Sequence, residues 1–216
     1  MIEICPAILT SSSKELKEEL LSYSKLFNII DIDINVDNDD FTGQITRRLE
    51  DVITILETMN EVPFLNLHLM VENPLKEINK VIGKSFENKI RFIIHQESSL
   101  DDVIFSFLGR DKIGATLKVD SELKDLEFYN KFSEVQLMTV SIGYQGNEFE
   151  KKVLEKSKEL KDMGFTGIIS IDGGVNLETV DEIKKYPINR VSVGSYFSKS
   201  EDLIKSKKEL EAALNG

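Results

Sequence analysis

Residues that bind transition metals are scarce in this sequence. Its 216 residues include one cysteine, two histidines and no tryptophan. A disulfide framework needs at least two cysteines, and zinc fingers or three-histidine zinc sites need more cysteine or histidine than the chain contains. Any bound metal ion would therefore take most of its ligands from carboxylates. Cys5 is expected to be a small buried side chain on a strand.

Positive charge and long apolar runs are also in short supply. Lysine and arginine number 27 against 38 acidic residues, and the net charge is −11. Nucleic acids and anionic membranes are bound mainly through basic surfaces, so we expect neither as a partner. No run approaches the ~18 apolar residues of a spanning helix, and the first residues do not resemble a secretory signal. We expect a cytoplasmic protein.

Short β-branched runs alternate with longer amphipathic segments along the whole sequence, a pattern typical of βα units and a parallel sheet. Helix-capping residues mark the start of several amphipathic segments. Strands are predicted at residues 2–9, 29–34, 64–69, 90–94, 112–117, 134–140, 167–171 and 190–193. Helices are predicted at about residues 13–26, 45–59, 75–84, 100–108, 122–131, 148–163, 177–185 and 201–214.

Eight βα units in 216 residues leave 27 residues per unit, with little room for a second domain. We therefore predict an α/β fold, a single (β/α)₈ TIM barrel with parallel strands that spans residues 1–216. Such barrels typically have ~250 residues and can be as short as ~200. An open doubly wound sheet is the alternative, although no glycine-rich turn follows the first predicted strand.

Polar side chains gather at the predicted carboxyl ends of the strands, where the active site of a barrel lies. Because side chains on a strand repeat with period two, Asp31 and Asp33 share one face, and so do Asn66 and His68. Carboxylates held close together repel and recruit a cation or protons. We therefore predict a divalent ion, Zn²⁺, Fe²⁺, Mn²⁺ or Mg²⁺, with four ligands, namely Asp31, Asp33, His68 and Asp172.

His95 also stands at a strand end. It is expected either to contact the substrate or to hydrogen-bond within the barrel.

Glycines follow the last three predicted strands. Glycine lets backbone N–H groups approach an anion, and barrels frequently bind phosphate in the loops after strands seven and eight. We therefore predict phosphate binding by Gly143, Gly146, Gly173, Gly174, Gly194 and Ser195.

The chain resembles the ribulose-phosphate 3-epimerase family along its whole length. The segments that carry the resemblance are Pro6-Ala7-Ile8-Leu9, Asp31-Ile32-Asp33, His68-Leu69-Met70, Met138-Thr139-Val140 with Gly143 and Gly146, Ile171-Asp172-Gly173-Gly174, and Val193-Gly194-Ser195. The family implies a metal-dependent, homo-oligomeric barrel that inverts C3 of a ketose phosphate through an enediolate, for example converting D-ribulose 5-phosphate to D-xylulose 5-phosphate. By position, Asp33 and Asp172 would be the acid/base pair. Ala7, Met70 and Met138 would form the substrate wall.

The chain departs from the family's pattern at several of these positions. Ala7 replaces a serine, Asp31 replaces a histidine metal ligand, and Asn66 replaces an aspartate. The Met-Asp-Gly that follows the family's strand-two aspartate is absent, and Ser141-Ile142-Gly143-Tyr144 replaces an Asn-Pro-Gly-Phe lid entry. The amide oxygen of Asn66 is expected to orient His68.

Three functions are compatible with these residues. The first is an epimerase-like isomerase. The alternative is a catalytically impaired barrel that binds a sugar phosphate in a regulatory or assembly role, which Ala7 and Asp31 favour. A decarboxylase or aldolase is disfavoured, because related decarboxylases use an Asp-x-Lys-x-x-Asp strand and residues 31–36 contain no lysine.

Overall fold

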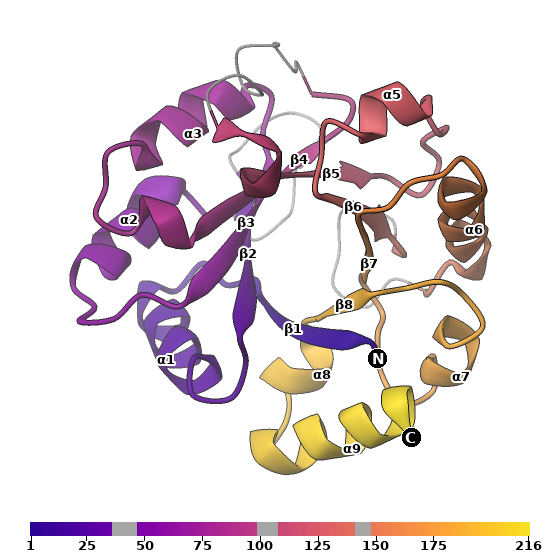
Figure 1. Cartoon of the computed structure of the whole chain (residues 1–216). Coiled ribbons are helices and arrows are strands. Elements are labelled where there is room, and N and C mark those ends of the chain that lie inside the picture. Colours follow the sequence, from indigo (N-terminus) through magenta and orange to yellow (C-terminus); the bar gives the residue numbers. More distant parts are fainter. Residues whose placement is uncertain (36–46, 99–107, 141–147) are drawn as a thin grey trace.

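Eight parallel strands close into a barrel in the computed structural model, which describes residues 1–35, 47–98, 108–140 and 148–216. Each strand pairs with the next along the chain, and β1 pairs with β8 to complete the ring (Figure 1). The barrel prediction is confirmed, and the open-sheet alternative is wrong. The strands are β1 (Glu3–Ile8), β2 (Ile29–Asn35), β3 (Phe64–Met70), β4 (Ile90–His95), β5 (Ile113–Leu117), β6 (Glu134–Met138), β7 (Ile168–Asp172) and β8 (Arg190–Val193).

Helices surround the barrel, and several of them are shorter than predicted. The α-helices are α1 (Ser13–Tyr23), α2 (Leu49–Glu57), α3 (Pro74–Val81), α5 (Leu126–Tyr129), α6 (Glu155–Asp162), α7 (Val180–Ile183), α8 (Ser195–Ser198) and α9 (Leu203–Asn215). Short 3₁₀ turns are η2 (Glu87–Lys89), η3 (Arg110–Lys112) and η4 (Lys151–Leu154). The helix predicted at 100–108 lies almost entirely outside the described residues. Among the described helices, none has the length and apolar character to cross a membrane.

Local sequence explains where several helices begin. The side chains of Ser12, Asn73 and Asp202 accept hydrogen bonds from the backbone N–H three residues later and so cap α1, α3 and α9. Pro74 occupies the first turn of α3, where its missing N–H costs no hydrogen bond. A side-chain cap of this kind stabilises a helix by about 1 kcal/mol.

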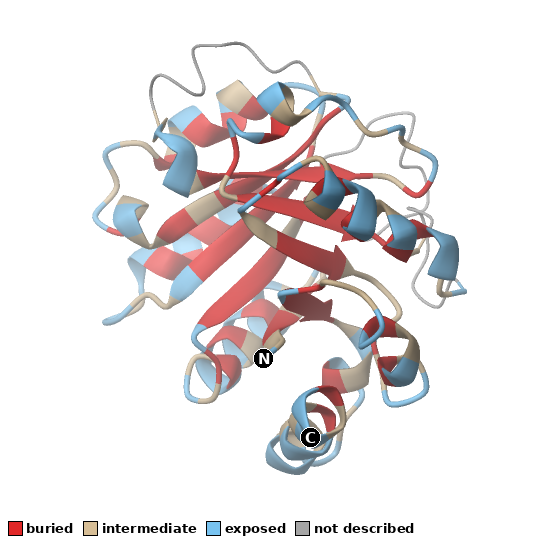
Figure 2. Ribbon diagram, turned by 45° about the vertical axis from the view of Figure 1, so that its right-hand side comes forward, coloured by how far each residue is buried: buried red, intermediate tan, exposed pale blue. Residues whose placement is uncertain are grey.

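The two faces of the strands have opposite chemical character. On β2, Ile30, Ile32 and Ile34 belong to the apolar core, whereas Asp31 and Asp33 alternate with them on the other face. Figure 2 shows that the strands are buried and that the helices expose their outer surfaces. Each fully buried isoleucine or leucine contributes about 1.5–3 kcal/mol. The core therefore lies between the sheet and the helices, and the barrel interior is left free for polar side chains.

Candidate active site

The amino-terminal end of the barrel interior contains two glutamates and two arginines, which we call the floor cluster: Glu3, Arg91, Glu134 and Arg190. Arg190 contacts Glu134 and lies 2.8 Å from Glu3, and Arg91 Nη1 lies 2.6 Å from Glu134 Oε2. Glu134 is fully buried. Burial lowers the pKa of Arg190, but the charges of Glu134 and Glu3 outweigh it and raise that pKa above its ordinary value. These acids are neutralised by arginine.

Asp31 lies deeper in the barrel than Asp33, and three side chains hydrogen-bond to it. Asn66 Nδ2 donates to Asp31 Oδ1 at 2.7 Å, Cys5 Sγ lies 3.1 Å from the same oxygen, and Ser192 Oγ donates to Oδ2. The pKa of Asp31 is raised by burial, although the hydrogen bonds from Ser192 and Cys5 act in the opposite direction. Cys5 is fully buried on β1, as predicted.

The carboxyl ends of β2, β3 and β7 bring together Asp33, His68 and Asp172, which we call the mouth triad. His68 Nδ1 lies 3.1 Å from Asp33 Oδ1 and 3.6 Å from Asp172 Oδ2. One donor atom from each residue lies within 4.8 Å of the others. The His68 side chain is buried, whereas those of Asp33 and Asp172 are 14% and 15% exposed. The two carboxylates are therefore accessible from the barrel mouth.

Burial and mutual repulsion control protonation in the mouth triad. Burial, followed by the nearby charge of Asp33, raises the pKa of Asp172 to about 8. Burial lowers the pKa of His68, but its hydrogen bond to Asp33 and the charges of both aspartates outweigh burial, so the pKa is raised overall. Two carboxylates thus share one imidazole, and the site favours uptake of a proton or a cation.

His95, at the end of β4, contacts the ring nitrogen of His68 that the two aspartates do not approach. Its Nε2 lies 3.1 Å from His68 Nε2, and the centroids of the two rings are 5.0 Å apart. Burial lowers the pKa of His95 to about 4, and the charge of His68 acts in the same direction. Glu97 Oε2 lies 3.8 Å from His95 Nδ1. The expectation that His95 hydrogen-bonds within the barrel is confirmed.

The mouth triad offers a donor set that fits a divalent cation. Two carboxylates and one imidazole are the ligands of many Mn²⁺, Fe²⁺ and Zn²⁺ sites that keep open positions for substrate. Asp31, the fourth predicted ligand, is not part of this group, and its oxygens accept the three hydrogen bonds described above. The expected orientation of His68 by Asn66 is wrong, because Asn66 donates to Asp31 and its Oδ1 has no hydrogen-bond partner among the described residues.

The predicted phosphate-binding residues divide into described and undescribed positions. Gly173 and Gly174 follow β7 with φ of 109° and 66°, and a Cβ on Gly173 would lie 2.4 Å from a methyl group of Val140. Backbone conformation and packing are therefore sufficient to explain glycine at these two positions. Gly194 and Ser195 lie at the start of α8, the short helix that sequence patterns missed. Gly143 and Gly146 lie outside the described residues.

The residues predicted to form the substrate wall lie on β1, β3 and β6. Met70 and Met138 end their strands and are buried, and Ala7 is half-buried. Met138 pairs in register with Asp172, and Ala7 pairs with Asp31. Met70 therefore shares β3 with His68. Ala7 and Met138 lie on strands next to β2 and β7, which carry Asp33 and Asp172.

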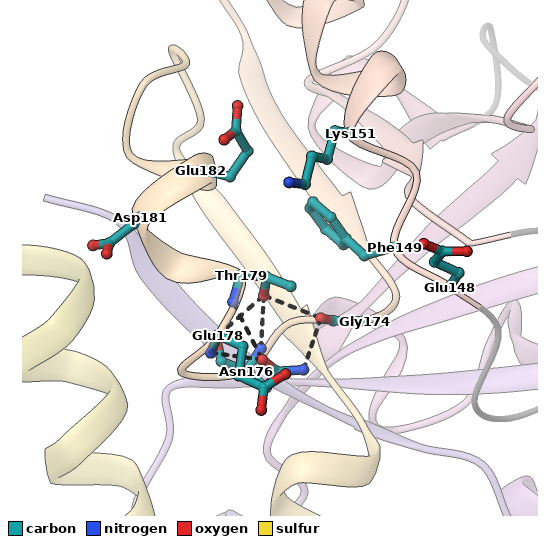
Figure 3. Close-up of a pocket in the computed structure, with 9 residues that line it drawn as sticks. All are labelled: Glu148, Phe149, Lys151, Gly174, Asn176, Glu178, Thr179, Asp181 and Glu182. Atoms are coloured by element: carbon teal, nitrogen blue, oxygen red, sulfur yellow. Dashed lines mark hydrogen bonds between the residues drawn. The ribbon is translucent and has the colours of Figure 1, made fainter.

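A pocket of about 370 Å³ opens beside Gly174, between residues 148–151 and the start of α7 (Figure 3). Its lining includes Phe149, Lys151 and Asn176, and Asn176 Oδ1 accepts from the backbone N–H of Glu178 and Thr179. The remaining polar lining is mostly acidic: Glu148, Glu178, Asp181 and Glu182. Four carboxylates against one lysine disfavour an anion here. Sequence patterns did not predict this pocket, because it depends on how the loops after β6 and β7 meet.

Sequence reasoning also missed Ser192 and Glu97 as partners of site residues. Ser192 lies on β8 at the same register as Cys5, so strand alternation would have placed it facing the interior. Glu97 follows β4 by two residues, and no pattern marks it.

A closed eight-stranded barrel with a carboxylate–imidazole cluster at the carboxyl ends of its strands defines a (β/α)₈ protein of the kind that places its site at the barrel mouth. The sequence profile of the ribulose-phosphate 3 epimerase family matches residues 3–198. The chain belongs to the ribulose-phosphate 3-epimerase family.

Its curated relatives are distant. Ribulose-phosphate 3-epimerase of Helicobacter pylori (strain ATCC 700392 / 26695) is 27% identical over 218 residues, which cover 93% of each chain. The enzyme of that name from Bacillus subtilis (strain 168) is 27% identical over 222 residues, covering 99% of this chain and 100% of the relative.

Solved structures share the fold at lower identity. The crystal structure of KGPDC from Streptococcus mutans has a TM-score of 0.65 and 12% identity, and covers 99% of this chain and 97% of its own. Tryptophan synthase subunit alpha from Campylobacter jejuni has a TM-score of 0.66 and 17% identity, with coverage of 97% and 94%. These two likenesses show the barrel fold.

Proposed function

We propose that this protein is a metal-dependent epimerase-like isomerase that inverts C3 of a ketose phosphate, converting D-ribulose 5-phosphate to D-xylulose 5-phosphate or acting on a related sugar phosphate. The observation that carries the proposal is the pair of partly exposed carboxylates, Asp33 and Asp172, which both approach His68 Nδ1 in a chain of this family. Inversion at carbon needs one group to remove a proton and another to deliver a proton to the opposite face.

The electrostatics of the pair suit this exchange. With its pKa raised to about 8 in the metal-free protein, Asp172 takes up and releases a proton near neutral pH, and Asp33 Oδ1 lies 3.1 Å from His68 Nδ1. In one direction Asp33 takes the C3 proton and Asp172 donates a proton to the other face. In the reverse direction the two residues exchange roles.

The predicted divalent ion would be held by Asp33, His68 and Asp172, whereas the oxygens of Asp31, the fourth ligand predicted from the sequence, accept hydrogen bonds from neighbouring side chains. When bound, it would offset the negative charge that develops on the substrate oxygens as the C3 proton leaves. A ligand set that includes an imidazole favours Zn²⁺, Fe²⁺ or Mn²⁺ over Mg²⁺. Burial of His68 beneath the two aspartates keeps water away from one side of the site.

Substrate binding is assigned to the loops that follow β6, β7 and β8. In this proposal the backbone N–H groups of Gly173, Gly174, Gly194 and Ser195 bind the phosphate together with Gly143 and Gly146. The net charge of −11 is no obstacle, because backbone N–H groups bind phosphate without lysine or arginine. Ala7, Met70 and Met138 form the apolar wall against the sugar. As in the family it resembles, we expect a homo-oligomer, which light scattering would check.

Incubation with D-ribulose 5-phosphate in deuterated water, with Zn²⁺, Mn²⁺ or Fe²⁺ added in turn, tests the proposal. We expect deuterium at C3 and formation of D-xylulose 5-phosphate, and we expect both to be lost in the Asp172→Asn variant. If neither appears with any of the metals, the pentulose phosphate is not the substrate.

The second candidate function, a sugar-phosphate-binding barrel without turnover, is favoured by one observation. The Asp31 carboxylate, at the position of a family metal ligand, accepts hydrogen bonds from Asn66 and Ser192 instead. This candidate predicts a rise in melting temperature with D-ribulose 5-phosphate and no C3 exchange.

A further inference from the structure

We propose that His95 is a positioning residue that sets the proton arrangement of His68, so that His68 Nδ1 faces Asp33 and Asp172 with a lone pair available to a divalent cation. The inference rests on the cation site of the proposed function. It adds a residue that does not itself bind the cation. The carrying observation is the 3.1 Å separation between the Nε2 atoms of the two rings.

Proton counting limits the possible arrangements. A hydrogen bond between two Nε2 atoms contains one proton, so one ring donates and the other accepts. If His95 donated, His68 Nε2 would be the acceptor, and a neutral His68 would carry its proton on Nδ1, pointing at the cation position. If His68 donates, its Nδ1 is left with a lone pair, or with a second proton that it shares with Asp33 when no cation is present. Only a donating His68 is compatible with both states of the site.

The surroundings of His95 favour the same arrangement. When its Nε2 accepts, the ring proton of His95 sits on Nδ1, which has no hydrogen-bond partner among the described residues and whose closest ion-pair partner is Glu97 Oε2, 3.8 Å away. Glu97 also accepts a hydrogen bond from Ser121 Oγ, which holds its carboxylate in place. A carboxylate next to Nδ1 favours a proton on that nitrogen. The order of contacts is therefore Glu97, His95, His68 and then the cation position.

Burial protects the hydrogen bond between the two rings. His68 is 1% exposed and His95 is 3% exposed, so bulk water does not compete for their hydrogen bond. The two ring planes are inclined by 26°, which is compatible with a hydrogen bond in the plane of the rings. A neighbour that orients a metal-ligating histidine typically changes metal affinity by about 10- to 100-fold when it is mutated.

Nuclear magnetic resonance of the ¹⁵N-histidine-labelled wild-type protein tests the arrangement directly, because the chain has only two histidines. Spectra would be recorded for the metal-free protein and after addition of Zn²⁺, which is diamagnetic. We expect His95 to carry its proton on Nδ1 in both states and His68 to keep its Nε2 proton in both. Zn²⁺ should shift the ¹⁵N resonance of His68 Nδ1. A proton on Nε2 of His95, or a bare Nε2 on His68, would overturn the proposal.

Zinc affinity of substituted proteins gives an independent test. His95→Phe keeps a ring but removes the acceptor, and we expect Zn²⁺ affinity to fall about 10- to 100-fold. His95→Gln restores an oxygen acceptor and should recover part of that loss. Thr116→Val is the matched control, because Thr116 is buried, pairs in register with His95 and has a hydroxyl without a hydrogen-bond partner among the described residues. Equal losses in His95→Phe and Thr116→Val would indicate general loosening of the barrel and contradict the proposal.

The outcome separates this inference from the proposed function. If the wild-type protein binds Zn²⁺ with the expected proton positions but shows no C3 exchange, the epimerase proposal fails and the role of His95 stands. If C3 exchange occurs and His95→Phe binds Zn²⁺ as tightly as the wild type, the role of His95 fails alone. If the wild type binds no Zn²⁺, the inference fails.

Discussion

The floor cluster and the mouth triad lie inside the same barrel and treat buried charge in opposite ways. At the floor, two arginines meet two glutamates, and Glu134 contacts both Arg91 and Arg190. At the mouth, two aspartates share one imidazole, and both remain partly exposed. The charges of the floor cluster are therefore balanced within the chain, whereas the mouth triad, with two acids and one imidazole, is short of positive charge. That shortage is what makes the mouth, and not the floor, a site for a cation or for proton exchange.

Asp31, which lies between the two regions, is stabilised in a third way. Its burial is close to that of Glu134, but it forms no ion pair with an arginine among the described residues, and hydrogen bonds from Asn66 and Ser192 stabilise it instead. Asp31 and Asp33 are two residues apart on one strand, so the same alternation directs both inward. Their different surroundings give them different chemistry.

The largest expected effect comes from breaking the floor cluster. Arg190→Met leaves Glu134 fully buried with one arginine fewer, and removing one partner of a buried pair costs about 3 kcal/mol or more. Urea unfolding would measure the loss. Lys158→Met is the control, because its pair with Glu155 is exposed and should change stability by less than about 1 kcal/mol. Equal effects of the two substitutions would remove the distinction between floor and surface.

Removing a charge from the mouth triad should instead raise the stability of the metal-free protein. Asp172→Asn removes a carboxylate that burial and Asp33 disfavour, so the metal-free protein should gain on the order of 2 kcal/mol at neutral pH. Between the ordinary pKa of 3.8 and the folded value of about 8, the folded wild-type chain binds more protons than the unfolded chain. Its stability should therefore fall as pH rises through this range, relative to the variant.

Urea unfolding of both proteins at pH 5, 6.5 and 8 would check this second prediction. The advantage of the variant should grow with pH and level off above about 8. A variant less stable than the wild type at pH 8 would show that the mouth is not short of positive charge.

Cation binding at the mouth should depend on pH for the same reason. A divalent ion must displace the proton from Asp172, so its apparent affinity should fall up to about tenfold per pH unit below about 8. Calorimetry with Zn²⁺ in two buffers of different ionisation enthalpy would detect the released proton. Asp172→Asn should bind Zn²⁺ more weakly and should release less. Proton release that is the same in both proteins would contradict the assignment.

The smallest expected effect concerns Asp31 and Asn66, which lie between the floor cluster and the mouth triad. Asp31→His and Asn66→Asp are neighbours in register, and together they restore the residue types of the family pattern. Each single change leaves a buried group without its present partner, whereas the pair can hydrogen-bond again. We expect a favourable coupling of about 1 kcal/mol in a double-mutant cycle of unfolding free energies. Additive effects would show that the two positions are independent.

Strand alternation and topology made part of this site predictable. Asp33, His68 and Asp172 could be brought together from the sequence, because parallel strands of a barrel end at one rim and inward positions repeat with period two. The separate fate of Asp31 could not be predicted. It depends on Ser192, which is 161 residues away in sequence and meets Asp31 only when the barrel closes.

Other features lacked a usable pattern. Helix α8 spans four residues, too few to show helical periodicity. Helices α5 and α7 are equally short, and their predicted lengths were too great for the same reason. The contact between His68 and His95 depends on strand register: His68 pairs with Ile93, which places His95 two residues farther along β4. Register between strands that are not joined by a hairpin is invisible in one sequence.

The proposed function requires the mouth triad to supply the ligands of a single divalent cation. Equilibrium dialysis of the wild-type protein and of Asp33→Asn against Zn²⁺, followed by metal analysis, tests it most directly. We expect one ion per wild-type chain, lost in the variant while its unfolding transition remains cooperative. A wild-type protein without bound zinc, or an Asp33→Asn variant that keeps the full complement, would contradict it.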